Sequence, residues 1–233
     1  MVGAIVMKAV VFDLKGNIAH FRRPDTTATH LTYPFITPLA AKGIVGSVLG
    51  ITDFITNDHV GIQLLKPVHT SSQQLSMLGK DGGHTFNRPT TVELLVNPAY
   101  RIYYVGDEYV EQLAEKLIKR QYVYHTYLGV AYAITIPEFI QYYDKVEIVS
   151  DEDIIETCSV VPINLIDKLI IQEDRYYSRA GGFMKDYLGK RRFEKSVSYI
   201  YEKDGRTIKF RMKKNENEGC FVVRIGDQQI CLV

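Results

Sequence analysis

The stretch from Phe12 to Gly50 constrains the fold most, because it contains a clearly signalled helix start. The hydroxyl of Thr37 can accept a hydrogen bond from a free backbone amide. Pro38 has no backbone N–H, but at the first helical position an N–H would have no partner within the helix, so no hydrogen bond is lost. We therefore predict a helix that begins at Pro38. Its apolar stripe for a core repeats at helical spacing and consists of Ala41, Ile44, Val45 and Val48.

The other faces of this helix carry small residues, which leave the backbone open to a close neighbour. Basic residues lie in the preceding loop and in the helix, and the free amides of a helix N-terminus favour an anion. Phosphate is the ligand that this combination indicates. The small residues are Gly43, Gly46, Ser47 and Gly50, and the basic residues are Lys15, His20, Arg22, Arg23 and Lys42.

Three segments resemble the Cas-five family, the subunit of type I CRISPR surveillance complexes that holds the 5′ handle of the guide RNA. The first is GNIAHFRRPDTTATHLTYPFITPLAAKGIVGSVLG, which is similar to the N-terminal signature of that family. The second is Arg88–Gly106, similar to the strand after the family's thumb. The third is Tyr124–Gly129, similar to a short mid-chain motif. We match no family motif beyond these segments.

Hydrophobic periodicity predicts a β-α-β-β-α-β order for the first half of the chain. Asp107 is the expected N-cap of the second helix. This order predicts a ferredoxin-like unit, and the resemblance implies the same fold, which is like that of an RNA-recognition motif. The aromatic RNP signature is absent, so loops and helix ends would have to bind RNA. The expected strands lie within residues 4–14, 59–68, 91–105 and 146–149.

The segment Thr70–Thr90 is long for a loop in a compact domain. From its residues alone it is a mobile surface loop or a functional one. In the family that it resembles, this position holds a thumb-like β-hairpin that projects into the guide RNA, where an apolar wedge can unstack a nucleotide. The candidate wedges are Leu75, Met77, Leu78 and Phe86, and the flanking cations for the RNA backbone are Lys80, His84 and Arg88.

The chain is expected to divide into an α+β domain of residues 1–150 and a β-rich C-terminal part of residues 151–233. In the latter, alternating residues predict strands on both sides of a turn at Asp204 and Gly205. A second hairpin is predicted around Gly226. The pattern at residues 150–158 fits a capped helix or a strand equally, and both alternatives stay open.

Charge is distributed unevenly, although the formal net charge is only +1. Residues 106–174 include 5 basic and 14 acidic residues, whereas residues 185–214 include 11 basic and 4 acidic residues. We expect the acidic region to face a protein partner and the basic region to face a polyanion. The segment Arg175–Phe193 interleaves aromatic residues with cations, which suits nucleic acid or a loop between subunits.

Several classes of protein are disfavoured. Cys158, Cys220 and Cys231 form no CxxC pair, which argues against a disulfide framework and a zinc site. Neither a Walker loop nor a nucleophile elbow occurs, and we expect no metal and no cofactor. No apolar run is long enough for a membrane span and no leader is recognisable, so we expect a cytoplasmic protein.

The resemblance implies a subunit that binds and caps the 5′ handle of the guide RNA in antiviral defence, together with a repeated backbone subunit and a large subunit. One alternative is a metal-independent endoribonuclease that processes the guide precursor, with a base near the ribose 2′-hydroxyl and a cation near the phosphate. Another alternative is a protein scaffold without RNA contact. We favour handle binding without cleavage. The candidate catalytic residues for the nuclease are Tyr33, Lys119 and His125.

Overall fold

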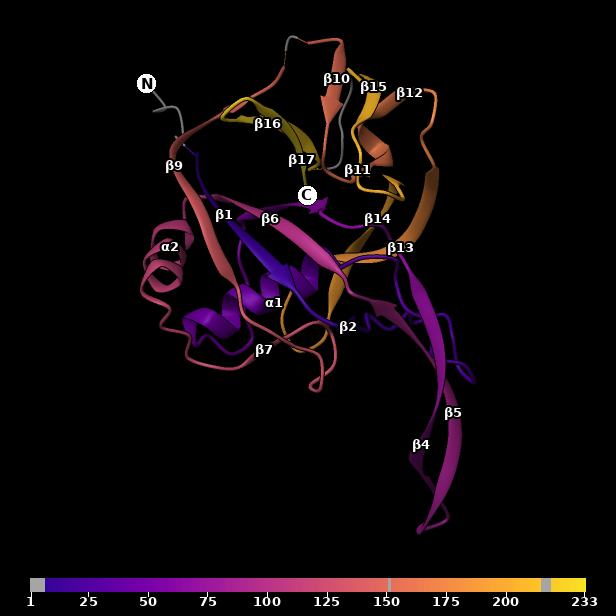
Figure 1. Cartoon of the computed structure of the whole chain (residues 1–233). Coiled ribbons are helices and arrows are strands. Elements are labelled where there is room, and N and C mark those ends of the chain that lie inside the picture. The colour runs from indigo at the N-terminus through magenta and orange to yellow at the C-terminus, as the bar shows by residue number, and fades with distance from the viewer. Residues whose placement is uncertain (1–6, 151, 215–218) are drawn as a thin grey trace.

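The structure is a computed structural model that describes residues 7–150, 152–214 and 219–233, and its largest element is a curled nine-stranded sheet (Figure 1). The described chain is mixed α+β and mostly sheet. The first half contains the predicted β-α-β-β-α-β order; residues 4–6 of the expected first strand lie outside the described residues. The elements are β1 (Met7–Lys15), α1 (Pro38–Leu49), β3 (His59–Leu64), β6 (Ala99–Gly106), α2 (Val110–Lys119) and β9 (Glu138–Ile148).

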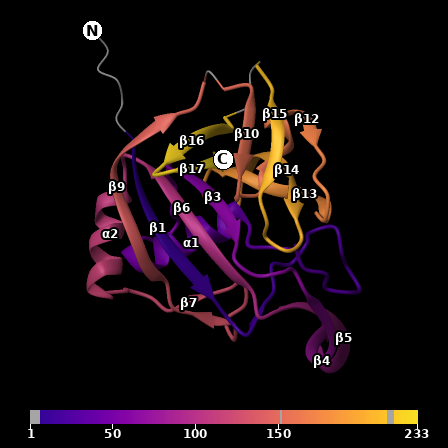
Figure 2. The same ribbon diagram turned by 45° about the horizontal axis from the view of Figure 1, so that its top comes forward.

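These four strands are neighbours in the large sheet, in the order β9-β1-β6-β3, and all their pairings are antiparallel. Side chains alternate along β1. Phe12 and Leu14 therefore point into the core beneath α1 and α2, which cover one face (Figure 2). Ala9 and Val11 point to the opposite face, where they join a second cluster with residues of the C-terminal strands.

Helix α1 is built as the local sequence predicts. The Thr37 hydroxyl accepts a hydrogen bond from the Ala40 amide at 3.1 Å, and Pro38 occupies the first turn. The helix ends at Gly50, whose φ of 79° lies in the left-handed region that glycine adopts without strain. All four residues of the predicted stripe are buried: Ala41, Ile44, Val45 and Val48.

The predicted cap of α2 is wrong. Tyr109 occupies the N-cap position and its side chain makes no capping bond. Instead, the buried carboxylate of Asp58 accepts hydrogen bonds from the amides of Asp107, Glu108 and Tyr109 at 3.0, 3.1 and 2.9 Å. The turn that leads into α2 is thus fixed by a residue about fifty positions earlier, which binds the amides of the N-cap residue and of the two residues before it.

The segment expected to be a thumb forms a long antiparallel hairpin of β4 (Thr70–Asp81) and β5 (His84–Val96), which projects from the rest of the molecule (Figure 1). Its root is tied to the core by β2 (Ile18–Ala19), which pairs with the end of β5. The strand expected within residues 91–105 divides at Asn97, which has a φ of 48°, into the end of β5 and β6.

The C-terminal part is β-rich, and β16 extends the large sheet by pairing with β9. Residues 154–157 form a strand, so the helix alternative for residues 150–158 is not adopted, and Asp151 lies outside the described residues. The final hairpin is confirmed. The elements are β10 (Ile154–Thr157), β11 (Val161–Pro162), a 3-10 turn (Ile163–Leu165), β12 (Ile166–Ile170), β13 (Tyr177–Tyr187), β14 (Phe193–Glu202), β15 (Ile208–Met212), β16 (Phe221–Ile225) and β17 (Gln228–Leu232).

The strands on either side of the Asp204–Gly205 turn do not form a hairpin, which corrects the sequence prediction. β14 pairs with β11 and β13, whereas β15 pairs with β10 and β12 in the large sheet. The Glu202 carboxylate accepts hydrogen bonds from the amides of Asp204 and Arg206 at 3.0 and 2.8 Å, and so redirects the chain between two sheets. No helix in the described residues is long and apolar enough to cross a membrane.

Candidate nucleic-acid interface

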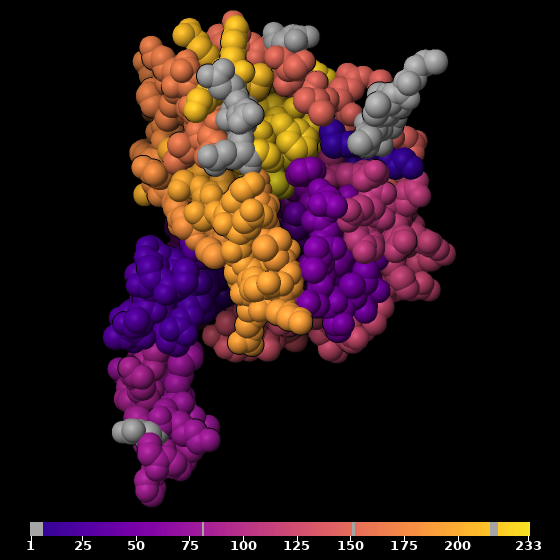
Figure 3. All heavy atoms as spheres, turned by 180° about the vertical axis from the view of Figure 1, so that it is seen from behind, coloured from indigo at the N-terminus to yellow at the C-terminus, as the bar shows by residue number. Residues whose placement is uncertain are grey.

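Two hollows flank a two-stranded arm formed by β13 and β14 (residues 177–202). Figure 3 shows this arm in orange, between the indigo loop of residues 20–34 and the purple surface that includes α1. One hollow lies between the arm and α1, and we call it the α1 pocket. The other lies between the arm and the base of the thumb, and we call it the thumb-root groove.

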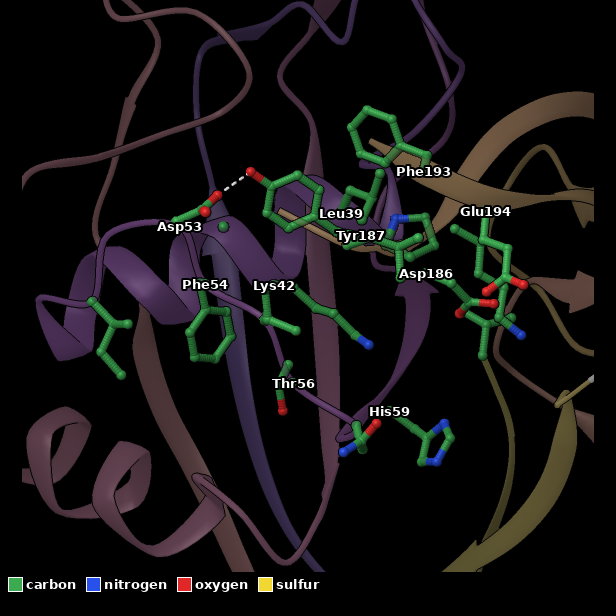
Figure 4. A pocket seen from close by; sticks show the side chains of 18 of the residues that line it. Leu39, Lys42, Asp53, Phe54, Thr56, His59, Asp186, Tyr187, Phe193 and Glu194 are labelled. Carbon is green, nitrogen blue, oxygen red and sulfur yellow. Dashed lines mark hydrogen bonds between the residues drawn. The ribbon is translucent and has the colours of Figure 1, made fainter. Parts of the chain in front are cut away.

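The α1 pocket has a volume of about 980 Å³ and opens beside the exposed face of α1 (Figure 4). One wall is the helix with the following segment, residues 51–57, and the opposite wall is the tip of the arm. The helix contributes three of the residues predicted to bind RNA, namely Lys42, Gly43 and Ser47. A Cβ added at Gly43 would meet nothing within 4 Å, so the pocket is open there.

Lys42 points into the α1 pocket (Figure 4). Two other lysines and three carboxylates also line the pocket: Lys185, Lys195, Asp53, Asp186 and Glu194. Burial lowers the pKa of the Lys42 ammonium group, and the nearby carboxylate of Asp186 partly opposes this shift. Lys42 forms no ion pair with the described residues of the chain. An ammonium group that is half-buried and lacks an anionic partner has an electrostatic reason to attract one.

The arm is fastened across this pocket by a side-chain contact. The hydroxyl of Tyr187 donates a hydrogen bond to the carboxylate of Asp53 (Figure 4). Asp53 and Asp186 both have left-handed backbone conformations, with φ of 55° and 53°. Such conformations cost energy outside glycine and are often found at functional sites.

The thumb-root groove has a volume of about 460 Å³ and is polar. Arg23, Arg179 and Lys203 line it with one carboxylate, Glu93. Arg23 is partly engaged, because its guanidinium binds both oxygens of Asp25 at 3.1 and 2.6 Å. The groove is therefore basic, although part of its charge is already neutralised.

A cluster of basic side chains, His20, Arg22, His30 and Arg88, adjoins the root of the thumb. The His20 and His30 rings stack with their centroids 6.5 Å apart. Burial lowers the pKa of both imidazoles, and for His30 the charges of Arg22 and Arg88 lower it further. We call these four residues the His–Arg cluster.

The cluster is fixed by backbone contacts with β5. The His30 amide donates to the Thr91 carbonyl at 2.9 Å, and the Glu93 amide donates to the His30 carbonyl at 2.9 Å. The His20 Nδ1 lies 2.7 Å from the Glu93 carbonyl oxygen, and its buried Nε2 has no partner among the described residues. The two imidazoles are therefore held in place from one strand of the thumb.

The thumb has two chemically different faces. Its register pairs Met77 with Arg88 and Gly79 with Phe86, and paired residues share a face. Leu75, Met77, Phe86 and Arg88 thus lie on one face, whereas Leu78 and Lys80 lie on the other. Leu78 is 80% exposed and Phe86 is 48% exposed. Three of the four predicted wedges therefore share a face with Arg88, and the fourth, Leu78, shares the other face with Lys80.

The predicted RNA-binding residues do not form a single site. His20, Arg22 and Arg88 meet at the thumb root, Arg23 lines the adjoining groove, and Lys42, Gly43 and Ser47 line the α1 pocket. Three further residues lie elsewhere. Lys80 is exposed on the thumb, on the face opposite to Arg88. Lys15 forms an ion pair with Glu138 at 2.8 Å. Gly46 faces the protein interior, where an added Cβ would lie 2.8 Å from the Phe54 Cβ.

The residues considered for RNA cleavage lie on separate elements. The Tyr33 hydroxyl donates to the Gly182 carbonyl, and its ring centroid lies 4.3 Å from that of Phe183. Burial raises the pKa of Tyr33. Lys119 pairs with Glu115 at 2.6 Å on the last turn of α2, and His125 is exposed just before β7 (Thr126–Tyr127), which pairs with β8 (Ile134–Thr135). Tyr33 and Lys119 are thus committed to partners within the protein.

Sequence reasoning missed His30, Arg179 and Tyr187 as individual site residues. Arg179 and Tyr187 lie in the aromatic and basic segment 175–193, whose composition did indicate a binding role. His30 carried no such signal, because its role depends on pairing beside Val92 of the thumb, more than sixty positions later.

The fold is shared with CRISPR-associated proteins. No family model and no curated protein sequence matches the chain. A CRISPR protein from Archaeoglobus fulgidus has a similar structure, with a TM-score of 0.56 and 10% identity over 96% of this chain and 98% of that chain. A chain of a CRISPR RNA-guided surveillance complex matches with a TM-score of 0.53 and 11% identity, over 87% of this chain and 90% of that chain.

Proposed function

We propose that this protein is a subunit of a type I CRISPR surveillance complex that binds and caps the 5′ handle of the guide RNA, as a member of the Cas-five family. The observation that carries the proposal is the His–Arg cluster at the root of a projecting thumb. It sits on a fold shared with CRISPR-associated proteins. Arginine side chains bind phosphates, and the apolar thumb side chains can lie against bases.

The central strands and helices support the RNA-binding proposal at the level of the fold. The order β9-β1-β6-β3, with α1 and α2 on one face, is the order expected of a ferredoxin-like unit and supports that assignment. In this arrangement the loop after β1 leads into α1, and the connection between β3 and β6 becomes the thumb. Both connections therefore meet at one end of the unit, where the His–Arg cluster lies.

A repeated backbone subunit and a large subunit are the protein partners in this proposal. Exposed apolar side chains on β7, β8 and the neighbouring segments offer a surface for one of them. Tyr127 and Ile134 are directly paired there and are 46% and 64% exposed. The other exposed side chains of this surface are Val123, Tyr124, Tyr132, Ile136 and Ile140.

The decisive experiment measures binding of repeat-derived RNA at several salt concentrations, with the isolated protein and with the protein assembled with its partner subunits. Salt-dependent binding and protection of the 5′ handle from an added nuclease are expected. Loss of RNA binding in both forms would leave the scaffold alternative. We expect no cutting of the RNA in the presence of a chelator. Specific cutting that His125→Ala abolishes in a folded protein would favour the endoribonuclease instead.

A further inference from the structure

The α1 pocket combines a cation with aromatic walls, and the His–Arg cluster at the thumb root does not share this combination. Leu39 and Phe54 lie on the helix side, and Tyr187 and Phe193 lie on the arm side (Figure 4). The ring centroids of Tyr187 and Phe193 are 5.4 Å apart. Aromatic faces stack on nucleic-acid bases of any sequence. The walls therefore suit a planar, unsaturated ring system.

The charge of the pocket lining is mixed, so the position of a single cation, Lys42, indicates where an anionic group would bind. Lys195 is paired with Asp186 at 3.9 Å, and Asp53 accepts a hydrogen bond from Tyr187. The Lys42 ammonium group projects from α1 between the two walls, and it has no ion-pair partner among the described residues (Figure 4). A phosphate group would supply the missing partner through charge-assisted hydrogen bonds. The volume of about 980 Å³ is within the range of pockets that enclose small ligands, and it is large enough for a nucleotide.

We propose that the α1 pocket holds one nucleotide, with its base between the helix wall and the arm wall and its phosphate on Lys42. The proposal rests on the proposed function in one respect, since the guide RNA supplies the nucleotide. The Tyr187–Asp53 contact then has a role, because it fixes the tip of the arm to the segment that follows α1. The pocket and the thumb root are separate binding places for one RNA strand.

Titration with adenosine monophosphate and with adenosine, followed by NMR or calorimetry on the full-length protein, tests the phosphate contact. We expect the monophosphate to bind about tenfold more tightly than the nucleoside, the factor that a charged hydrogen bond gives. In Lys42→Met this ratio is expected to fall to about one, because only the phosphate contact is lost. Lys168→Met, an exposed lysine on β12, is the matched control and should keep the ratio.

Gly43→Leu tests the pocket without disturbing the fold. The added side chain enters open space, so it should fill the pocket and remove binding of both ligands, while the unfolding temperature stays the same or rises. Gly43→Ala fills much less space and should retain binding. Unchanged affinity in Gly43→Leu, or an unchanged ratio in Lys42→Met, would overturn the proposal.

RNA binding separates this proposal from the function on which it rests. If repeat RNA binds in a salt-dependent manner but neither the nucleotide titration nor Gly43→Leu shows an effect, the pocket assignment is wrong and the RNA-binding function stands. If the unmodified protein binds neither RNA nor the monophosphate, the proposed function is wrong as well. Binding of the monophosphate with weaker RNA binding in Gly43→Leu is the expected result.

Discussion

The thumb and the arm are both two-stranded antiparallel extensions, but they differ in how they meet the hydrophobic core. The thumb reaches it at its root, through Leu95 of β5, whereas the arm contributes Phe183, Val197 and Tyr199. In the arm, Phe183 is fully buried, and its ring packs against Tyr33 and Phe35 with centroid distances of 4.3 and 5.0 Å. In the thumb, Leu78 and Phe86 remain largely exposed. The arm therefore completes its packing within the chain, whereas the thumb keeps apolar groups in solvent.

This difference indicates what each extension contributes. Buried aromatic contacts make the arm a fixed wall, so a pocket beside it can hold a ligand in a defined position. The thumb lacks a core of its own, and a two-stranded hairpin alone is marginally stable in water. Its exposed apolar side chains are better explained by contact with a partner than by a contribution to folding. Substitutions in the arm should therefore lower the stability of the protein, whereas substitutions in the thumb should mainly lower its affinity for a partner.

Phe183→Ala is expected to have the largest effect on stability. Removal of a fully buried ring from the core should lower the free energy of unfolding by about 3–5 kcal/mol. Phe86→Ala removes a ring of the same type from the thumb, where it is half-exposed, and should cost less than about 1 kcal/mol. Urea unfolding curves measure both values. Equal losses would show that the thumb is part of the folded core.

The same contrast occurs within α1, between two glycines. An added Cβ at Gly46 would lie 2.8 Å from the Phe54 Cβ and 3.3 Å from the Ile51 carbonyl oxygen, so Gly46→Ala should destabilise the protein by about 1–3 kcal/mol. Gly43 meets nothing, and Gly43→Ala should stabilise it by about 0.5–1 kcal/mol. Thermal unfolding checks both signs. Gly46 thus serves packing, contrary to the role in RNA contact that its sequence context indicates.

Substitutions at the thumb root should change RNA affinity and leave stability nearly unchanged. Arg22 and Arg88 have no ion-pair partner among the described residues, so the double substitution Arg22→Gln with Arg88→Gln should remove two phosphate contacts. The slope of log affinity against log salt should become flatter by roughly 1.4, at about 0.7 per phosphate of single-stranded RNA. Unfolding curves should change little, since both side chains lie at the surface.

A matched control uses cations that are already paired. Lys15 binds Glu138 and Lys119 binds Glu115, so Lys15→Gln with Lys119→Gln removes two cations whose charge is already paired and should leave the salt slope unchanged. If the control flattened the slope as much as the arginine variant, the charge effect would be general. The proposal that the thumb root is a specific phosphate site would then be wrong.

The elements that could be predicted from sequence are those whose signals are local. Helix α1 carries its cap, its first proline and its stripe within twelve residues, and the structure confirms them. The contact that fixes the start of α2 was missed because Asp58 lies far away in sequence. The β14–β15 hairpin was predicted wrongly because alternation shows which residues are buried but does not identify the partner strand.

The surface charge was also hard to predict from sequence, because it depends on ion pairs between residues that are distant in the chain. Residues 106–174 are acidic in sequence, but much of that charge is neutralised by cations from other segments. Lys8 pairs with Glu111, and Lys209 pairs with Glu156 at 3.8 Å. A count along the chain therefore overstates the charge of the surface. The remaining pairs with cations outside the segment are Lys15–Glu138, Lys214–Asp153 and Arg224–Glu152.

The smallest expected effect is a pH dependence at the thumb root. Burial lowers the pKa of His20 in the folded protein, whereas the unfolded chain has the ordinary value near 6.5. As the pH falls through that value, the unfolded state takes up a proton that folded His20 does not, so the stability of the free protein should decrease. Urea midpoints at pH 7.5 and 5.5 measure this decrease, which His20→Gln should reduce.

Bound RNA should reverse part of this dependence. The charges of Arg22 and Arg88 contribute to the lowered pKa of His30, and a phosphate placed among these groups would offset them and favour the protonated imidazole. Affinity for RNA should therefore rise between pH 7.5 and 5.5, and His30→Gln should flatten that rise while Gly43→Leu leaves it intact. If His30→Gln kept the full rise, protonation elsewhere would drive it, and the cluster would bind phosphate through its arginines alone.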